Sequence, residues 1–84
     1  MYATMLRRSY LSKKLIGPLT TKDGGTLRSV LEVRRYMLRL SKERGTAQRW
    51  QRAAELLREQ ADTGALSNQV QLALFYDRKL DLTA

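Results

Sequence analysis

The amino-acid sequence predicts an all-α protein, a small three-helix bundle that follows a flexible basic N-terminal arm. Apolar residues recur at spacings of three, four and seven from residue 26 onwards, and turns that contain Gly45 and Gly64 separate the periodic segments. With 84 residues, the chain is long enough for one small hydrophobic core and too short for two. We therefore expect a basic arm over residues 1–17 and a single helical domain over residues 18–84.

The N-terminal segment is basic and has no clear helical face. Residues 1–17 contain four basic side chains and no acidic one, which is typical of a flexible arm and is also the composition of a mitochondrial transit segment. The dipeptide Gly17-Pro18 ends this segment. Leu19-Thr20-Thr21 then favours one short extended segment, which the turn over residues 22–25 closes. Because no later segment alternates apolar and polar residues, we predict no sheet.

Three helices are expected over residues 26–44, 47–62 and 65–79. Thr26 is the predicted N-cap of the first helix, and Gly45 is the residue type that best accepts the left-handed conformation after its last turn. Trp50 lies in the middle of the apolar stripe of the second helix, so we expect it in the core. The third helix is apolar around most of its circumference, which indicates a sandwiched helix or an exposed partner surface.

The composition excludes most catalytic classes. The sequence has no cysteine and no histidine, so it offers no disulfide, no thiolate or imidazole metal ligand and neither of the two most versatile catalytic side chains. The phosphate-binding patterns GxxxxGK[ST] and GxGxxG and the nucleophile pattern GxSxG are also absent. We therefore expect a protein that is not an enzyme and uses no cofactor. The longest apolar run, residues 72–76, is far shorter than the ~20 residues of a membrane span, and we expect a cytoplasmic location.

Positive charge is concentrated in the middle of the chain. The net charge is +8, and residues 34–52 hold seven basic side chains against one acidic side chain. Eleven of the sixteen basic residues are arginine, whose forked guanidinium suits phosphate or carboxylate. The favoured hypothesis is a small binding protein that contacts nucleic-acid phosphates. Four of its predicted anion-binding residues form one stripe on the first helix, and the other two lie at the start of the second helix: Arg28, Arg35, Arg39 and Lys42, with Arg49 and Arg52.

The same arginines also have a simpler interpretation. Arg28 and Arg35 can pair with Glu32, Arg39 with Glu43 and Arg52 with Glu55, all at helical spacing. Arg34 projects into the apolar sector of the first helix, and we expect it to lie at the edge of the core or to pair with Asp77. A helix-turn-helix motif fits neither turn glycine well, because polar residues occupy its buried positions or its reading helix lacks basic residues.

The alternative function is a helical protein-interaction module or small regulator. In this hypothesis the third helix forms a dimer or partner surface with the C-terminal Leu80 and Leu82, and the arginines face an acidic protein. The predicted partner-binding residues are large and apolar: Leu72, Phe75, Tyr76 and Leu80.

Overall fold

The protein has a mixed α/β fold, so the predicted all-α three-helix bundle is wrong. The computed structural model describes residues 8–23 and 25–81, which form five helices and a two-stranded antiparallel sheet. Their order along the chain is α1 (Arg8–Leu11), β1 (Lys14–Thr21), β2 (Gly25–Ser29), α2 (Val30–Leu38), α3 (Lys42–Gly45), α4 (Gln48–Arg58) and α5 (Thr63–Tyr76).

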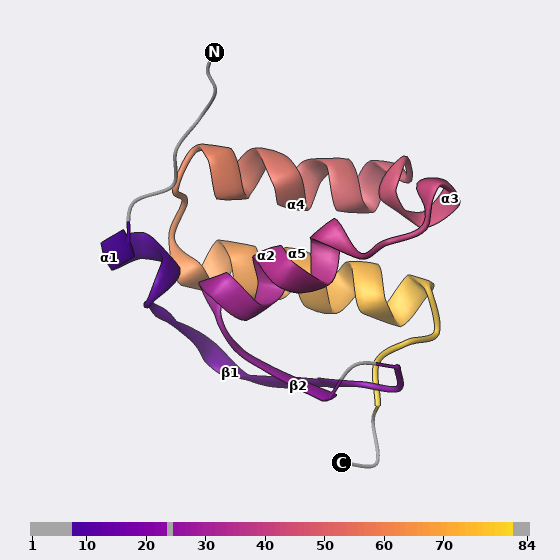
Figure 1. Cartoon of the computed structure of the whole chain (residues 1–84), viewed down its shortest axis with the longest axis horizontal. Helices are drawn as coiled ribbons and strands as arrows, with labels where there is room; N and C mark the ends of the chain where they lie inside the picture. The colour runs from indigo at the N-terminus through magenta and orange to yellow at the C-terminus, as the bar shows by residue number, and fades with distance from the viewer. Residues whose placement is uncertain (1–7, 24, 82–84) are drawn as a thin grey trace.

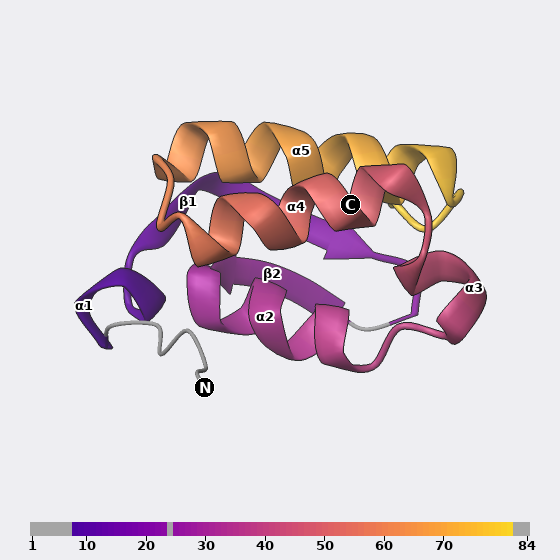
Figure 2. The same cartoon turned by 90° about the horizontal axis from the view of Figure 1, so that it is seen from above.

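The elements form three layers (Figures 1 and 2). The β1–β2 hairpin is the base, α2 and α5 lie side by side on one of its faces, and α4 covers those two helices from the other side. Helix α5 packs on β1, α2 packs on β2, and α4 packs on α5. The opposite face of the hairpin has no covering layer among the described residues. The hydrophobic core therefore lies between the hairpin and α4.

The hairpin arises because residues 25–29 pair with the expected extended segment. Leu19 lies opposite Leu27 and Thr20 opposite Thr26, and the two threonine hydroxyls are 3.2 Å apart. Gly25 has φ +83°, a left-handed conformation that glycine adopts at little cost. The segment after α5 adds a short third partner at the end of β1, where Lys22 N–H donates to the carbonyl of Lys79 at 2.8 Å.

The predicted helix over residues 26–44 is divided into β2, α2 and α3. Ser29, not Thr26, is the N-cap of α2. Its hydroxyl accepts from Glu32 N–H, and the Glu32 carboxylate accepts from Ser29 N–H, which completes a capping box. Leu27 fits both the helical spacing to Val30 and the buried face of a strand, and its pairing with β1 decides in favour of the strand.

The predicted glycine caps are also wrong. Gly45 and Gly64 lie inside α3 and α5, whereas Gln60 (φ 52°) and Arg78 (φ 57°) follow the ends of α4 and α5 in the left-handed conformation. After α4, Ala61 N–H donates to Leu56 O at 2.9 Å, and Gln60 N–H donates to Leu57 O at 3.0 Å. Equivalent bonds follow α5, so both helices end in a Schellman motif without glycine.

Part of the predicted arm belongs to the core. Tyr10 is only 3% exposed, and its hydroxyl donates to the carbonyl of Ala61 at 2.7 Å. Leu15 on β1 is also buried. Residues 8–17 therefore fold with the domain, and residues 1–7 lie outside the described residues. The prediction that Trp50 is a core residue is confirmed, because its side chain is 1% exposed.

Candidate functional site

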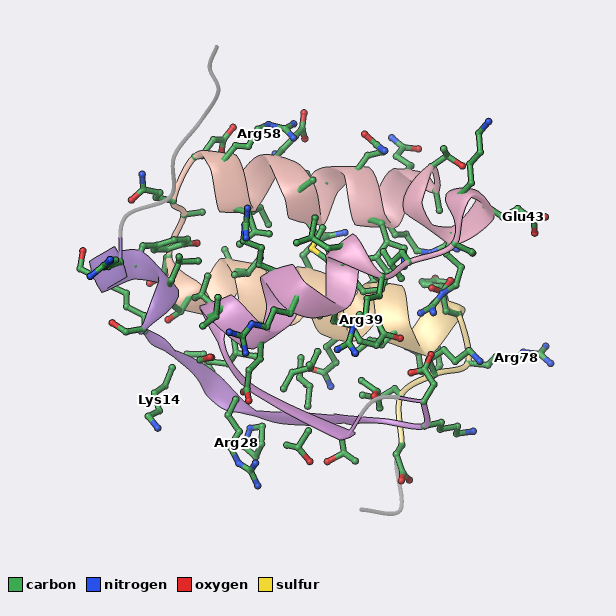
Figure 3. All side chains as sticks on the ribbon, viewed as in Figure 1. Lys14, Arg28, Arg39, Glu43, Arg58 and Arg78 are labelled. Carbon is green, nitrogen blue, oxygen red and sulfur yellow. The ribbon has the colours of Figure 1, made fainter. Side chains whose placement is uncertain are left out.

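The structure does not keep the predicted helical stripe of Arg28, Arg35, Arg39 and Lys42 together. Arg28 lies on β2, Lys42 on α3, and Arg49 and Arg52 on α4. Of the four stripe residues, only Arg35, on α2, and Arg39, which is its C-cap residue, share a helical face. Figure 3 shows the separation: Arg28 extends below the hairpin, Arg39 lies over α2, and Arg58 extends above α4.

Helix α2 nevertheless has a strongly cationic outer side. Its inner side buries Val30, Val33 and Tyr36. Three arginines and one leucine are exposed on the opposite side, since positions three or four apart share a face of a helix: Arg34, Arg35, Leu38 and Arg39. Leu38 is 70% exposed, an unusual value for a leucine on a helix that packs into a core. The outer side of α2 thus combines positive charge with apolar surface.

Four exposed basic residues near α2 have no acidic partner. Arg28, Arg35, Arg39 and Lys42 are solvent-exposed. The expected pairs of Arg28 and Arg35 with Glu32, and of Arg39 with Glu43, are not among the ion pairs of residues 8–23 and 25–81. Glu32 is instead used in the capping box, where its carboxylate also accepts from the backbone N–H of Arg28. We call Arg28, Arg35, Arg39 and Lys42 together the cationic surface; Arg35 and Arg39 lie at α2, whereas Arg28 lies on β2 and Lys42 on α3.

The two predicted residues on α4 have acidic partners. Arg52 forms an ion pair with Glu55 at 3.2 Å, as the helical spacing predicts. Arg49 lies 3.7 Å from a carboxylate oxygen of Asp77, and its guanidinium carbon lies 4.9 Å from the centre of the Tyr76 ring. Arg49 is therefore held against α5 and is not part of the cationic surface.

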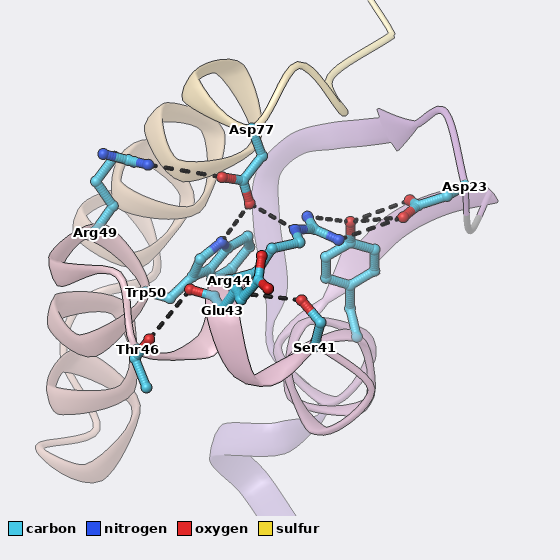
Figure 4. Close-up of polar contacts among 9 residues, drawn as sticks. Asp23, Ser41, Glu43, Arg44, Thr46, Arg49, Trp50 and Asp77 are labelled. Atoms are coloured by element: carbon cyan, nitrogen blue, oxygen red, sulfur yellow. Dashed lines mark hydrogen bonds and ion pairs between the residues drawn. The ribbon is translucent and has the colours of Figure 1, made fainter.

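Arg44 and Asp77 are the centre of a polar network that the sequence did not indicate (Figure 4). Asp77 accepts hydrogen bonds from Arg44 Nε and from the indole N–H of Trp50, both at 2.7 Å. Arg44 also donates to the Tyr36 hydroxyl at 2.8 Å and lies 3.4 Å from Asp23 in the hairpin turn. The network joins the turn, α2, α3, α4 and the end of α5. The expected Arg34–Asp77 pair is wrong, because Arg44 and Arg49 occupy that carboxylate.

The network changes the protonation equilibria of its members. Burial alone would raise the pKa of Asp77, but the hydrogen bonds from Trp50 and Arg44 and the charges of Arg44 and Arg49 outweigh burial and lower it. Burial raises the pKa of Tyr36, although the hydrogen bond and charge of Arg44 act in the opposite direction. Asp77 is consequently ionised and Tyr36 neutral at neutral pH, so the contacts in Figure 4 are charge-assisted.

The predicted partner-binding residues do not all lie on the surface. Leu72, Phe75 and Tyr76 are 43%, 54% and 59% exposed, and the two aromatic rings meet edge to face with centroids 5.8 Å apart. Leu80 is only 9% exposed and lies in the core, where its backbone pairs with Thr21. The exposed part of the predicted surface is therefore on α5.

Within residues 8–23 and 25–81, no group of three or more Asp and Glu side chains is placed to hold a metal ion, and no helix is long and apolar enough to cross a membrane. Comparison of the chain with protein-family models, curated proteins and solved structures gave no match.

Proposed function

We propose that the protein is a small non-enzymatic binding protein that contacts nucleic-acid phosphates through its cationic surface. The observation that supports this proposal is the set of four exposed cations at 28, 35, 39 and 42, none of which has a carboxylate partner in the described part of the chain. Three of the four are arginines, which bind phosphate in a bidentate manner. Unpaired cations of this kind favour a polyanionic ligand.

The arrangement suits the nucleic-acid backbone better than base edges. Arg35 and Arg39 lie one helical turn apart, about 6 Å along the axis of α2, which is close to the axial rise of about two phosphates along one strand. The outer side of α2 presents arginines and leucine, without the asparagine and glutamine that read adenine edges. We therefore expect binding that depends weakly on base sequence and strongly on salt.

Fluorescence anisotropy tests this proposal. A labelled random-sequence DNA duplex and an RNA hairpin are titrated with the protein at 50 mM and 200 mM salt. Four phosphate contacts predict a slope of about −3.6 for log affinity against log salt, which is a loss of about 150-fold between the two concentrations. No binding at 50 mM salt would overturn the proposal.

A matched pair of variants tests the assigned surface. Arg35→Gln with Arg39→Gln should reduce the slope to about −1.8, because two phosphate contacts are lost. The control is Arg52→Gln with Arg58→Gln, which removes the same charge from α4 and should leave the slope unchanged. An equal effect of both double variants would show that only net charge matters and would contradict the assignment.

The exposed aromatic pair on α5 favours a second candidate function, that of a protein-interaction module that homodimerises. Phe75 and Tyr76 form an exposed apolar surface with Leu72, and contiguous exposed apolar surface marks interaction sites. This function predicts that the sedimentation coefficient increases with protein concentration and that Phe75→Ser abolishes the increase. A monomer at all concentrations would exclude homodimerisation.

A further inference from the structure

A groove between α2 and α4 lies beside the cationic surface and is not used by the proposed contacts with phosphate. Its volume is about 420 Å³. Met37, Leu38 and Leu40 line the α2 side, and Trp50, Ala54 and Leu57 line the α4 side. The groove is open to solvent on one side, so an occupant would keep one face in water. We call it the α2–α4 groove.

The charges at this groove are all positive. Arg34 on α2 and Arg58 at the end of α4 belong to its lining, and the lining includes no carboxylate. Both arginines are exposed, and neither takes part in an ion pair among residues 8–23 and 25–81. An occupant that complements this site must supply apolar groups for the floor and anionic groups for the two arginines.

The dimensions suit a helix. The two walls are formed by helices of nine and eleven residues, about 13 and 16 Å long. Three apolar anchors at positions i, i+4 and i+7 of a helix span about 10 Å, so they fit within the length of the groove. A helix that lies in an open groove also keeps its polar side in solvent, whereas pockets for small molecules usually enclose most of the ligand.

From this combination we propose that the α2–α4 groove binds an amphipathic helix of a partner protein, in which acidic residues flank the apolar stripe. The apolar stripe packs on Leu38, Ala54 and Leu57, and the acidic residues pair with Arg34 and Arg58. This proposal is independent of the contacts with nucleic acid, because it uses a different set of side chains.

The test uses two synthetic helical peptides without tryptophan or tyrosine. Both have leucine at positions i, i+4 and i+7, and the flanking positions carry glutamate in one peptide and lysine in the other. Binding is measured by anisotropy of labelled peptide and by the fluorescence of Trp50, the single tryptophan of the chain, which lines the groove. We expect the glutamate peptide to bind about tenfold more tightly, since two exposed charge pairs change from repulsive to attractive.

Charge reversal separates a specific site from general attraction. Arg34→Glu with Arg58→Glu should reverse the preference, so that the lysine peptide binds more tightly. The control is Lys22→Glu in the hairpin turn with Arg28→Glu on β2. It makes the same change in net charge and should keep the preference for glutamate. Ala54→Leu fills the floor and should abolish binding of both peptides, while circular dichroism shows that the fold is retained.

Four results would overturn the proposal. The first is that neither peptide binds at millimolar concentration, and the second is that the groove and hairpin double variants have equal effects. The third is that dodecanoate binds in place of peptide with the same change in Trp50 fluorescence. The fourth is that the protein forms a dimer that Ala54→Leu abolishes. The last two results would assign the groove to a small amphiphile or to a second copy of the chain. None of the four depends on the outcome of the nucleic-acid titration.

Discussion

Asp77→Asn should destabilise the protein by about 3 kcal/mol. The Asp77 side chain is 9% exposed and accepts two hydrogen bonds of 2.7 Å, from Arg44 and Trp50. Hydrogen bonds to charged groups contribute about 1.5–3 kcal/mol each, and the 22% exposure of Arg44 places this pair at the lower end. Both bonds end on the same oxygen, Oδ2, so an asparagine that keeps its amide oxygen there still loses the negative charge that strengthens them, and its NH₂ group faces Arg49, which lies 3.7 Å from Oδ1 in the wild type.

Thermal and urea denaturation followed by circular dichroism measure the effect. A change of about 3 kcal/mol lowers the Tm of a domain of this size by roughly 12–24 °C. The pKa of Asp77 is lowered in the folded state from its ordinary value of 3.8, so the unfolded chain binds more protons than the folded chain near that pH. The contribution of Asp77 is therefore complete at neutral pH and is lost as the pH falls below about 4 towards the folded pKa. The difference between wild type and Asp77→Asn should shrink over the same range.

The control is Glu43→Gln, which removes a carboxylate that is exposed and has no ion pair in the described part of the chain. Its free energy of unfolding should stay within about 0.5 kcal/mol of wild type at every pH. If Asp77→Asn behaved like this control at pH 7, or if its effect were constant down to pH 2, the network would not stabilise the fold through an ionised Asp77.

Three further substitutions test the local backbone and the network. Gln60→Gly should stabilise the protein by about 0.5–1 kcal/mol, since glycine adopts the left-handed conformation after α4 without steric cost; urea denaturation measures it, and a loss of stability would contradict the Schellman geometry. Gly45→Ala should raise the Tm by a few degrees, corresponding to at most about 1 kcal/mol, because the new Cβ would meet only Leu40 at 3.9 Å and the residue is helical; a lower Tm would contradict its helical placement. Tyr36→Phe removes the hydroxyl that joins Arg44 to Asp23 and should cost about 1–2 kcal/mol in the free energy of unfolding; an unchanged urea midpoint would contradict a structural role for that hydroxyl.

Two of the three expected helices exist. The sequence predicts them because each segment carries its own helical repeat of apolar residues. The helix predicted over 47–62 is α4 (Gln48–Arg58), and the helix predicted over 65–79 is α5 (Thr63–Tyr76). Their apolar residues recur at helical spacing over more than two turns, which a strand does not allow. Their ends were less predictable, since Gln60 and Arg78 replace glycine in the left-handed position and carry no sequence signal for it.

The hairpin could not be predicted because its second strand is only five residues long. Leu27 is the single buried residue of β2, and one apolar residue cannot distinguish a period of two from a period of 3.6. The capping box of Ser29 and Glu32 was a readable signal, since a serine followed three residues later by glutamate marks a helix start. That signal would have placed the start of the helix at residue 30 and left residues 25–29 free to pair with β1.

The candidate sites show the same limit. A helix over 26–44 would align Arg28, Arg35, Arg39 and Lys42, but β2 and the break before α3 place the first and last of these on other elements. The α2–α4 groove was also beyond prediction, because it depends on two helices that are not consecutive in the sequence. The basic composition indicated an anionic partner. Only the structure shows that Arg34 and Arg58 line an apolar groove, whereas Arg35 and Arg39 are exposed outside that groove.

The polar network connects stability to the α2–α4 groove. Tyr36 on α2 and Trp50 on α4 contact each other with ring centroids 5.8 Å apart. The Tyr36 hydroxyl accepts a hydrogen bond from Arg44, and the Trp50 indole donates to Asp77, which also accepts from Arg44. Trp50 is also part of the groove wall. Loss of the Asp77 carboxylate should therefore loosen the spacing of the two helices before the chain unfolds, since the acceptor that fixes the orientation of the indole loses its negative charge. In Asp77→Asn at temperatures well below its Tm, binding of the glutamate peptide should weaken, while the salt slope for DNA should stay unchanged because no side-chain hydrogen bond or ion pair among the described residues joins Arg35 or Arg39 to the network.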